Sequence, residues 1–154
     1  MMKLSRKSDY ALRALVYLTL NRHRTPISIR ELAAENDVPK RFLELIMLEM
    51  KGQGWVESTT GRIGGFKLAK PPNAITMGQV VRYFDGLLAP VWCVSVSQYE
   101  PCSQEPKCRF RRVLLDARNY VAKLMDEATL ERVALESIVT IEEVFNDNYD
   151  GAGI

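Results

Sequence analysis

Apolar residues recur at intervals of three and four positions through much of this chain, the spacing that places them on one face of an α-helix. The pattern predicts a first helix over residues 9–20. Its expected buried face comprises Leu12, Leu15, Val16 and Leu20. The stretch Arg22-His23-Arg24-Thr25-Pro26 breaks the pattern and ends this helix, because proline disrupts a helix interior.

Two further helices are joined by a tight turn. The second helix is predicted to begin at Ser28, with Glu31 three residues later in the capping-box spacing, and to end near Asn36-Asp37. Pro39 suits the first position of the third helix. The inward face of the third helix comprises Phe42, Leu43, Ile46, Met47 and Met50. Two short helices joined in this way are typical of a helix-turn-helix.

A short β-hairpin is expected after the third helix. Two strands are predicted around residues 55–58 and 66–69, joined by the glycine-rich loop 59–65. A hairpin that directly follows a recognition helix is a wing. The predicted fold is therefore mostly α with a small β wing: a winged helix-turn-helix domain over residues 1–72, followed by a long dimerisation helix.

The second half of the chain contains a capped helix, a loop and a long helix. The capped helix begins at Thr76, with Gln79 in the capping position, and ends at Asp85-Gly86. The long helix follows an irregular loop and carries a continuous apolar stripe. The stripe comprises Phe110, Val113, Leu114, Ala117, Tyr120, Val121, Leu124 and Met125. Such a stripe packs either on the chain's own winged domain or on a second copy related by a two-fold axis.

These elements divide the chain by role. We expect a DNA-binding domain over residues 1–72, a linker helix over 73–86, a cysteine loop over 87–108, a dimerisation helix with a short C-terminal helix from Thr129 over 109–138, and a tail over 139–154 that frays from Asn146.

Charge becomes informative when the chain is divided. The 154 residues are 47% hydrophobic and 26% charged, which is ordinary for a globular protein. Residues 1–72 hold 13 Lys and Arg against 7 Asp and Glu, whereas the remainder holds 8 against 12. The basic first half favours a polyanionic partner. No apolar run is long enough to span a membrane and no export signal is recognisable, so we expect a cytoplasmic protein without a membrane partner.

Double-stranded DNA is the polyanion that a winged helix-turn-helix would bind. The candidate contact residues are Ser28, Arg30, Pro39, Lys40, Arg41, Glu44, Thr60 and Arg62. In the major groove Arg41 can pair with guanine and Glu44 can accept from cytosine, although Glu44 can equally form a surface ion pair. Ser28 and Arg30 suit the phosphate backbone. Arg62 on the wing suits the minor groove, while the wing glycines can simply supply positive φ angles.

Three cysteines lie close together in the sequence, at Cys93, Cys102 and Cys108. An odd number in a chain expected to be cytoplasmic indicates metal ligation or redox chemistry rather than a disulfide framework. The spacing lacks the Cys-x-x-Cys of a zinc knuckle. Three thiolates on an irregular loop suit an iron–sulfur cluster, while zinc, a thiol redox switch and structural coincidence remain open. The only histidine, His23, is not expected to be a ligand.

Over residues 1–137 the chain resembles the Rrf2 family of winged-helix transcription regulators. The segments that carry the resemblance are Leu4-Ser5 and residues 9–15, 28–33, 38–44, 61–69 and 85–91, followed by the three-cysteine loop. Two features depart from the family pattern: the interval between Cys93 and Cys102 is longer than usual, and Thr60 stands where the wing usually carries arginine.

The resemblance implies a homodimer, joined through the long helix, that binds a pseudo-palindromic promoter operator. It also implies an iron–sulfur cluster on the three cysteines, with four irons favoured and two open. In the family's nitric-oxide sensors an aspartate donated by the other subunit is the fourth ligand, and Asp9 occupies that position here. The alternative role of Asp9 is to cap the N-terminus of the first helix or to stabilise the helix dipole there. Arg111 stands where the cluster-biogenesis branch has histidine, so the ligand pattern is closer to the nitric-oxide and iron-sensing branches.

We therefore expect a repressor, not an enzyme, whose affinity for DNA is controlled by the cluster. A rival within the same fold is a thiol or zinc sensor without iron. A rival of another class is an electron-transfer or catalytic iron–sulfur protein, but no phosphate-cradling loop or Ser–His–acid set is recognisable in the sequence. In a third alternative the chain binds DNA and its cysteine loop only packs.

Overall fold

The N-terminal part of the molecule is a winged helix in the computed structural model, which describes residues 2–146. Helices α1 (Arg6–Leu20), α2 (Ile29–Glu35) and α3 (Lys40–Gly52) precede a hairpin of strands β1 (Val56–Thr59) and β2 (Gly65–Leu68). The two strands are antiparallel. The fold is mostly helical with a small β wing, which confirms the predicted fold class.

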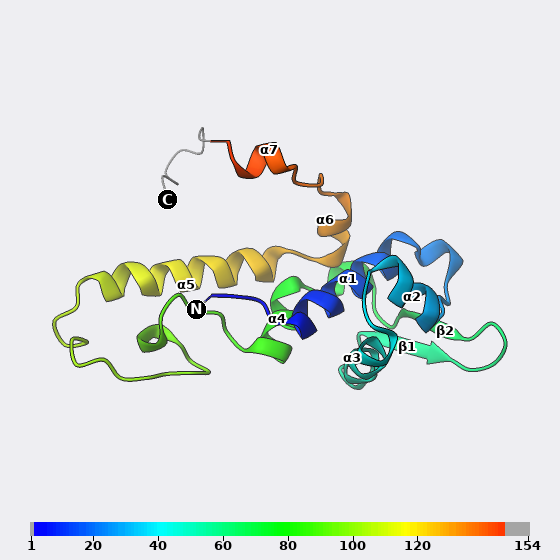
Figure 1. Cartoon of the computed structure of the whole chain (residues 1–154), viewed down its shortest axis with the longest axis horizontal. Helices are drawn as coiled ribbons and strands as arrows, with labels where there is room; N and C mark the ends of the chain where they lie inside the picture. Colours follow the sequence, from blue (N-terminus) through cyan, green and yellow to red (C-terminus); the bar gives the residue numbers. More distant parts are fainter. Residues whose placement is uncertain (1, 147–154) are drawn as a thin grey trace.

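The second part of the molecule is an elongated helical extension. It contains α4 (Met77–Asp85), α5 (Phe110–Glu127), α6 (Leu130–Leu135) and α7 (Ile141–Val144). Short 3-10 turns lie at Arg22–Arg24, Pro72–Ala74 and Trp92–Val94. Figure 1 shows that α5 runs along the long axis of the molecule, with the wing near one end and the loop between α4 and α5 at the other.

The helix termini follow local capping chemistry, with some corrections to the predicted boundaries. The capping box at Thr76 and Gln79 is complete, as predicted. The first helix begins at Arg6 rather than Asp9, because the Ser5 side chain caps it by accepting from the backbone N–H of Ser8. Pro39 is the N-cap of α3 rather than its first helical residue. Each strand is shifted by one residue from its predicted range.

A single buried cluster joins the winged helix to the extension. Its members on α1 and α3 include Leu15, Leu18, Leu43 and Ile46, all fully buried. The predicted inward face of α3 is confirmed, although Phe42 is only partly buried, whereas Leu20 on α1 is 55% exposed and was wrongly assigned to the core. The same cluster continues through Ile75, Val80 and Leu130, so α4 and α6 share the core of the winged helix.

The apolar stripe of α5 divides into two faces. Leu114, Val121 and Met125 are half-buried, and the last two line a small hollow with residues of α4. The remaining members face outward: Phe110, Val113, Ala117, Tyr120 and Leu124. These outward residues alternate in steps of three and four, the heptad spacing of a helix that pairs with another helix. We call them the α5 seam. Its first side chain, Phe110, is 79% exposed.

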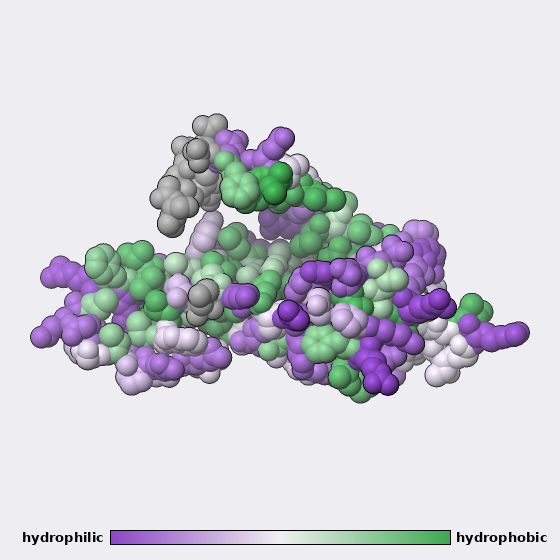
Figure 2. All heavy atoms as spheres, in the orientation of Figure 1, coloured by the Kyte–Doolittle hydropathy of each residue, from purple (hydrophilic) through white to green (hydrophobic). Residues whose placement is uncertain are grey.

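The segment after α6 is apolar and exposed. Ile138, Ile141 and Phe145 are each at least 75% exposed. Figures 1 and 2 show this segment running back on the side of α5 opposite α4, with a concentration of apolar atoms on it. The short helix α7 lies inside the range expected to be a tail, so it is an addition to the prediction. The fraying predicted from Asn146 falls mainly on residues 147–154, outside the described residues.

Candidate DNA-binding surface and cysteine loop

The outer face of α3 presents the residues predicted to read DNA bases. Pro39, Lys40, Arg41 and Glu44 are all exposed. The Nζ of Lys40 lies 3.8 Å from Oε1 of Glu44, and both side chains are about half exposed, so this surface ion pair is weak. Both alternatives for Glu44 remain compatible with this geometry, because a weak exposed pair can be exchanged for a base contact.

Two leucines on the same face were missed by the sequence interpretation. Leu45 is 59% exposed and Leu48 is 65% exposed. Leu45 lies one helical turn after Arg41, and Leu48 one turn after Glu44, so the four side chains form one patch. Their spacing could have revealed them, since neither residue belongs to the three-and-four pattern of the buried face.

The start of α2 lies beside the wing. Ser28 is the N-cap of α2 and accepts a hydrogen bond of 3.1 Å from the backbone N–H of Glu31, and Arg30 is exposed. Ile27, just before Ser28, exchanges backbone hydrogen bonds of 2.9 and 2.8 Å with Phe66 on β2. The predicted phosphate-binding residues and the wing are therefore held in one rigid unit.

The wing tip is exposed and carries one cation. Thr60 and Arg62 are exposed, and Ile63 beside them is 90% exposed. Gly61 has a φ of 110°, a left-handed conformation that L side chains rarely adopt. The turn thus requires glycine, and it also holds Arg62 in solvent. The two roles proposed for the wing residues are compatible.

An ion-pair network fixes α2 against α1. Glu31 accepts hydrogen bonds from the Arg24 guanidinium and, at 2.8 Å, from the hydroxyl of Tyr17. These bonds lower the pKa of Glu31, the one from Arg24 contributing most. Burial, and then the bond to the Glu31 carboxylate, raise the pKa of Tyr17. The network ties the first turn of α2 to α1 and to the turn that follows α1.

The cysteine loop brings two of its three thiols to one hollow. Cys93 and Cys108 both line a hollow of about 490 Å³ beside α5, whereas Cys102 is exposed and does not line it. Within residues 2–146 no three His, Cys, Asp or Glu side chains lie close enough together to hold a metal ion. A site that uses all three thiols therefore requires the segment around Cys102 to move.

Glu105 holds the loop together, and no sequence pattern marked it. Its carboxylate accepts bonds of 3.2 Å from the backbone N–H of Cys102 and 2.9 Å from the Tyr99 hydroxyl. It also lies 3.4 Å from the guanidinium of Arg111 on α5. The bond to Glu105 raises the pKa of Tyr99. Cys102 is thus positioned by a charged residue that α5 itself anchors.

Arginines of α5 attach the first cysteine segment to that helix. Arg111 donates bonds of 3.2 and 2.9 Å to the carbonyl of Cys93, and Arg118 donates one of 2.7 Å to the carbonyl of Val94. Arg111, Arg112 and Arg118 all line the hollow that contains Cys93. The hollow is therefore cationic, which suits anionic thiolates or a negatively charged cluster.

Asp9 lies on the first turn of α1, where it is bound to Arg13. The two side chains form paired hydrogen bonds of 3.0 and 2.6 Å. Ser5, not Asp9, caps the helix, which corrects the capping alternative, although a charge in the first turn still suits the helix dipole. Asp9 does not group with the cysteines within the described chain, and a role as ligand would require it to leave Arg13.

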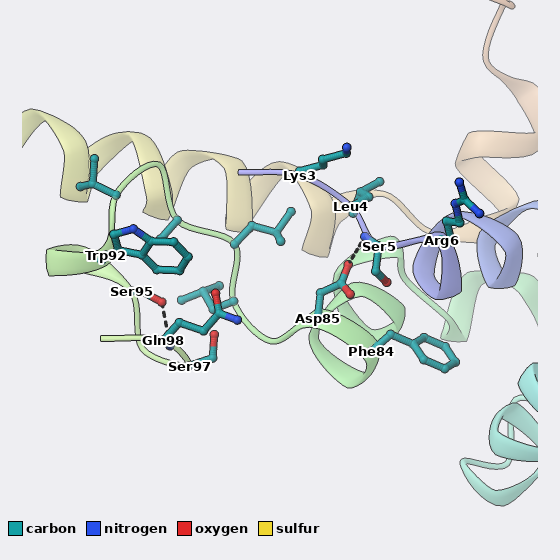
Figure 3. A pocket seen from close by; sticks show the side chains of 14 residues that line it. Lys3, Leu4, Ser5, Arg6, Phe84, Asp85, Trp92, Ser95, Ser97 and Gln98 are labelled. Carbon is teal, nitrogen blue, oxygen red and sulfur yellow. Dashed lines mark hydrogen bonds between the residues drawn. The ribbon is translucent and has the colours of Figure 1, made fainter. Parts of the chain in front are cut away.

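The start of the cysteine loop meets the start of α1 at a second hollow (Figure 3). This hollow, about 540 Å³, is lined by Lys3, Ser5, Asp85, Trp92 and Gln98 among others. The carboxylate of Asp85 accepts a hydrogen bond of 2.9 Å from the backbone N–H of Ser5. The N-cap of α1 is thus bonded to the last residue of α4, two residues before the cysteine loop begins. This bond connects the end of α4, which leads into the cysteine loop, to the start of the winged helix.

Comparison with known proteins decides the family. The Rrf2 family, described as iron-dependent transcriptional regulators, matches residues 4–136. The chain belongs to the Rrf2 family. An rrf2-like HTH-type regulator of Rhodobacter capsulatus is 38% identical over 134 residues, which cover 83% of this chain and 89% of that protein. The regulator NsrR of Geobacillus kaustophilus is 32% identical over 143 residues, covering 90% and 97% of the two chains.

The fold comparison agrees with the family assignment. The structure of CymR, the global cysteine regulator of Bacillus subtilis, superimposes with a TM-score of 0.74 at 29% identity, covering 87% of this chain and 97% of CymR. These Rrf2 proteins are named as transcriptional regulators, which is a non-enzymatic role. The prediction of a winged-helix regulator that is not an enzyme is confirmed. No helix within the described residues is long and apolar enough to cross a membrane.

Proposed function

We propose that this Rrf2 regulator is a cytoplasmic, dimeric DNA-binding protein, a repressor whose affinity for a promoter operator is set by an iron–sulfur cluster on its cysteine loop. The observation that carries the proposal is the hydrogen bond between Ser5, at the start of the winged helix, and Asp85, at the end of the helix that leads into the cysteine loop. A sensor loop that only packed against the surface would not require that connection.

DNA binding is supported by the residues that the winged helix leaves exposed. The outer face of α3 presents Lys40, Arg41 and Glu44, and the wing presents Arg62. A helix of this kind fits the major groove, while an arginine on a wing suits the narrower minor groove. Ser28 and Arg30 then lie beside the wing, where phosphate contacts would fix the register of the helix on the duplex.

Dimerisation is supported by the α5 seam. Its five outward side chains keep a heptad spacing over four turns and lie in solvent. Pairing of two seams about a two-fold axis would bury them and would place two winged helices on a pseudo-palindromic operator.

The donor types of the loop suit a cluster. Cys93, Cys102 and Cys108 would hold it, with Asp9 of a second copy as the candidate fourth ligand. A bound cluster would supply redox and ligand-exchange chemistry at thiolate-held iron. The cationic hollow lined by Arg111, Arg112 and Arg118 would offset the negative charge of the thiolates. Glu105 would have to release Cys102, since it holds the backbone of that residue away from the hollow.

The chain's own residues then carry the signal to DNA. A change in the loop alters the environment of Asp85, the last residue of α4. Asp85 holds the N-cap of α1, and α1 packs on α3 through the contact between Tyr10 and Phe42, whose ring centroids lie 5.7 Å apart. Because this route is packed and hydrogen-bonded, a shift at the loop changes how α3 is presented to DNA.

The cofactor is tested on protein purified without oxygen. We expect visible absorption at about 400 nm, typical of thiolate-ligated clusters, together with iron and acid-labile sulfide. Cys102→Ala should abolish the absorption while leaving the circular dichroism spectrum and the oligomeric state unchanged. The matched control is Ser103→Ala, an exposed neighbour that should retain the full spectrum. A colourless wild-type protein with zinc or only free thiols would replace the cluster with the thiol or zinc alternative.

DNA binding is tested on duplexes selected from a random pool. The logarithm of the binding constant should fall linearly with the logarithm of the salt concentration, with a slope proportional to the number of phosphates contacted. Arg41→Ala should weaken binding and relax the sequence preference of the selected duplexes. A chain that carries a cluster but enriches no duplex would instead support an electron-transfer role.

A further inference from the structure

The recognition face of α3 contains an apolar pair that the proposed contacts leave unexplained. Leu45 and Leu48 are 59% and 65% exposed, although Leu43, Ile46, Met47 and Met50 of the same helix are fully buried. They lie three residues apart, so they are neighbours on the helix surface. Arg41 and Glu44 precede them by one turn each, which places the pair on the face expected to meet DNA.

A single exposed leucine requires no explanation, but this pair differs in position and surroundings. The other exposed residues of the face are polar or charged, from Lys40 to Lys51. Replacement of either leucine by a polar residue would cost little buried apolar area, since each residue is already more than half exposed. The apolar character of this position therefore points to an external apolar group.

Only one such group lies on the floor of the major groove. Leucine has no donor or acceptor, so it cannot pair with a phosphate or with the nitrogen and oxygen atoms of a base edge. The 5-methyl group of thymine is the apolar feature that the base pairs present there. We infer that Leu45 and Leu48 contact thymine methyl groups and specify A·T pairs in the operator, next to the pairs read by Arg41 and Glu44. This inference rests on the proposed DNA-binding function.

The test removes the methyl group alone. The full-length protein, as purified without oxygen, is used to select duplexes from a random pool, and each thymine of the best duplex is then replaced singly by uracil. Burial of one methyl group corresponds to about a fourfold change in affinity. We therefore expect that uracil weakens binding about fourfold at one or two positions, which lie next to the base pairs where Arg41→Ala loses its sequence preference. Uracil at the other thymines should have no effect.

Each leucine is assigned to one thymine by combining the protein variants with the uracil-substituted duplexes. Leu45→Ala and Leu48→Ala should each weaken binding to the thymine duplex and should each abolish the effect of uracil at its own position. The control is Leu20→Ala, which changes a leucine of similar exposure (55%) at the end of α1 and should retain both uracil effects. All three variants replace exposed leucines with a better helix former, so folding should be unaffected.

The outcomes separate this inference from the proposed function. If no duplex is enriched by the selection, DNA binding itself fails. If a duplex is enriched and bound but uracil is tolerated at every position, DNA binding stands and the role of the leucines is wrong. Retention of the uracil effect in both leucine variants would also overturn the assignment, because the methyl contact would then belong to another residue.

Discussion

Gly78 lies where α4 meets α5, and the contact leaves no room for a side chain. A Cβ at this position would lie 2.0 Å from Oδ1 of Asp126 and 3.0 Å from the backbone N of the same residue. Gly78→Ala should therefore push the two helices apart and lower the free energy of unfolding by about 1–3 kcal/mol. Chemical denaturation measures the change. Gly52→Ala on α3 is the control, since nothing lies within 4 Å of its Cβ position; equal losses in both variants would contradict the close contact.

Asp126 also carries the ion pair that joins α4 to α5. Arg82 binds its carboxylate with two nitrogens, one at 2.6 Å from Oδ2, and these bonds lower the pKa of Asp126. A carboxylate with a lowered pKa in the folded state stabilises the protein above its ordinary pKa of about 4, and that contribution is lost as the pH falls through the lowered value. Because both side chains are over 40% exposed, the contribution is about 1 kcal/mol or less.

Asp126→Asn should therefore be less stable than the wild-type protein at pH 7, and the difference should shrink as the pH falls below about 4. Urea unfolding of both proteins at pH values from about 3 to about 7 measures this difference in the free energy of unfolding. A difference that stays constant across this range would mean that the side chain acts through packing rather than charge.

At the scale of elements, the α5 seam has a charge pattern that favours an antiparallel pair. With Ala117 of one copy opposite Tyr120 of the other, heptad geometry places Asp116 of each copy beside Lys123 of the other. Within one chain these residues form only loose pairs, Asp116 with Arg112 at 3.6 Å and Lys123 with Glu127 at 3.8 Å. They are therefore available for pairing between copies.

Asp116→Lys should weaken the dimer about tenfold, because two attractive contacts become repulsive at once. The double variant Asp116→Lys with Lys123→Asp should restore the dimer, since the two charges are exchanged. Sedimentation equilibrium gives both dissociation constants. Failure of the double variant to recover would mean that the seams pair in another register or do not pair.

The elements were largely predictable because each follows a local rule. The capping box at Thr76, the inward face of α3 and the glycine-rich wing are properties of a few neighbouring residues. The two faces of α5 were not separable, since periodicity shows that Leu114 and Val113 are both apolar but not which of them is half-buried and which is exposed. The position of Glu105 between Cys102 and Arg111 was not predictable either, because an irregular loop has no period. For the same reason, the separation of Cys102 from the other thiols had no signal in the sequence.

At the scale of the whole molecule, the bond between Asp85 and Ser5 should govern communication rather than folding. Asp85→Ala should leave the oligomeric state and the absorption of the cluster unchanged. We expect it to reduce the ratio of DNA affinities between the cluster-loaded and cluster-free protein by about threefold or more, within the range by which single mutations change allosteric coupling. Fluorescence anisotropy on the selected duplex measures both affinities.

Glu100→Ala, which changes an exposed acid inside the loop, is the matched control and should keep the ratio of the wild-type protein. An unchanged ratio in Asp85→Ala would exclude the bond as the connection, and the signal would then pass through the helices of the core instead.

The shared core has a consequence for transplanting this regulator's specificity. Ile75, Val80 and Leu130 are buried with the side chains of α1 and α3, so a chimera cut at residue 72 would separate surfaces that fit one another. A winged helix grafted from a relative at that point would bring buried side chains that fit the α4 and α6 of the relative rather than those of this chain. The set of residues that can be transferred to change the specificity for DNA is smaller. It comprises the exposed face of α3 and the wing tip, whose side chains can be exchanged without changing the buried core. New operators are therefore best sought by rewriting that surface, not by exchanging the domain beneath it.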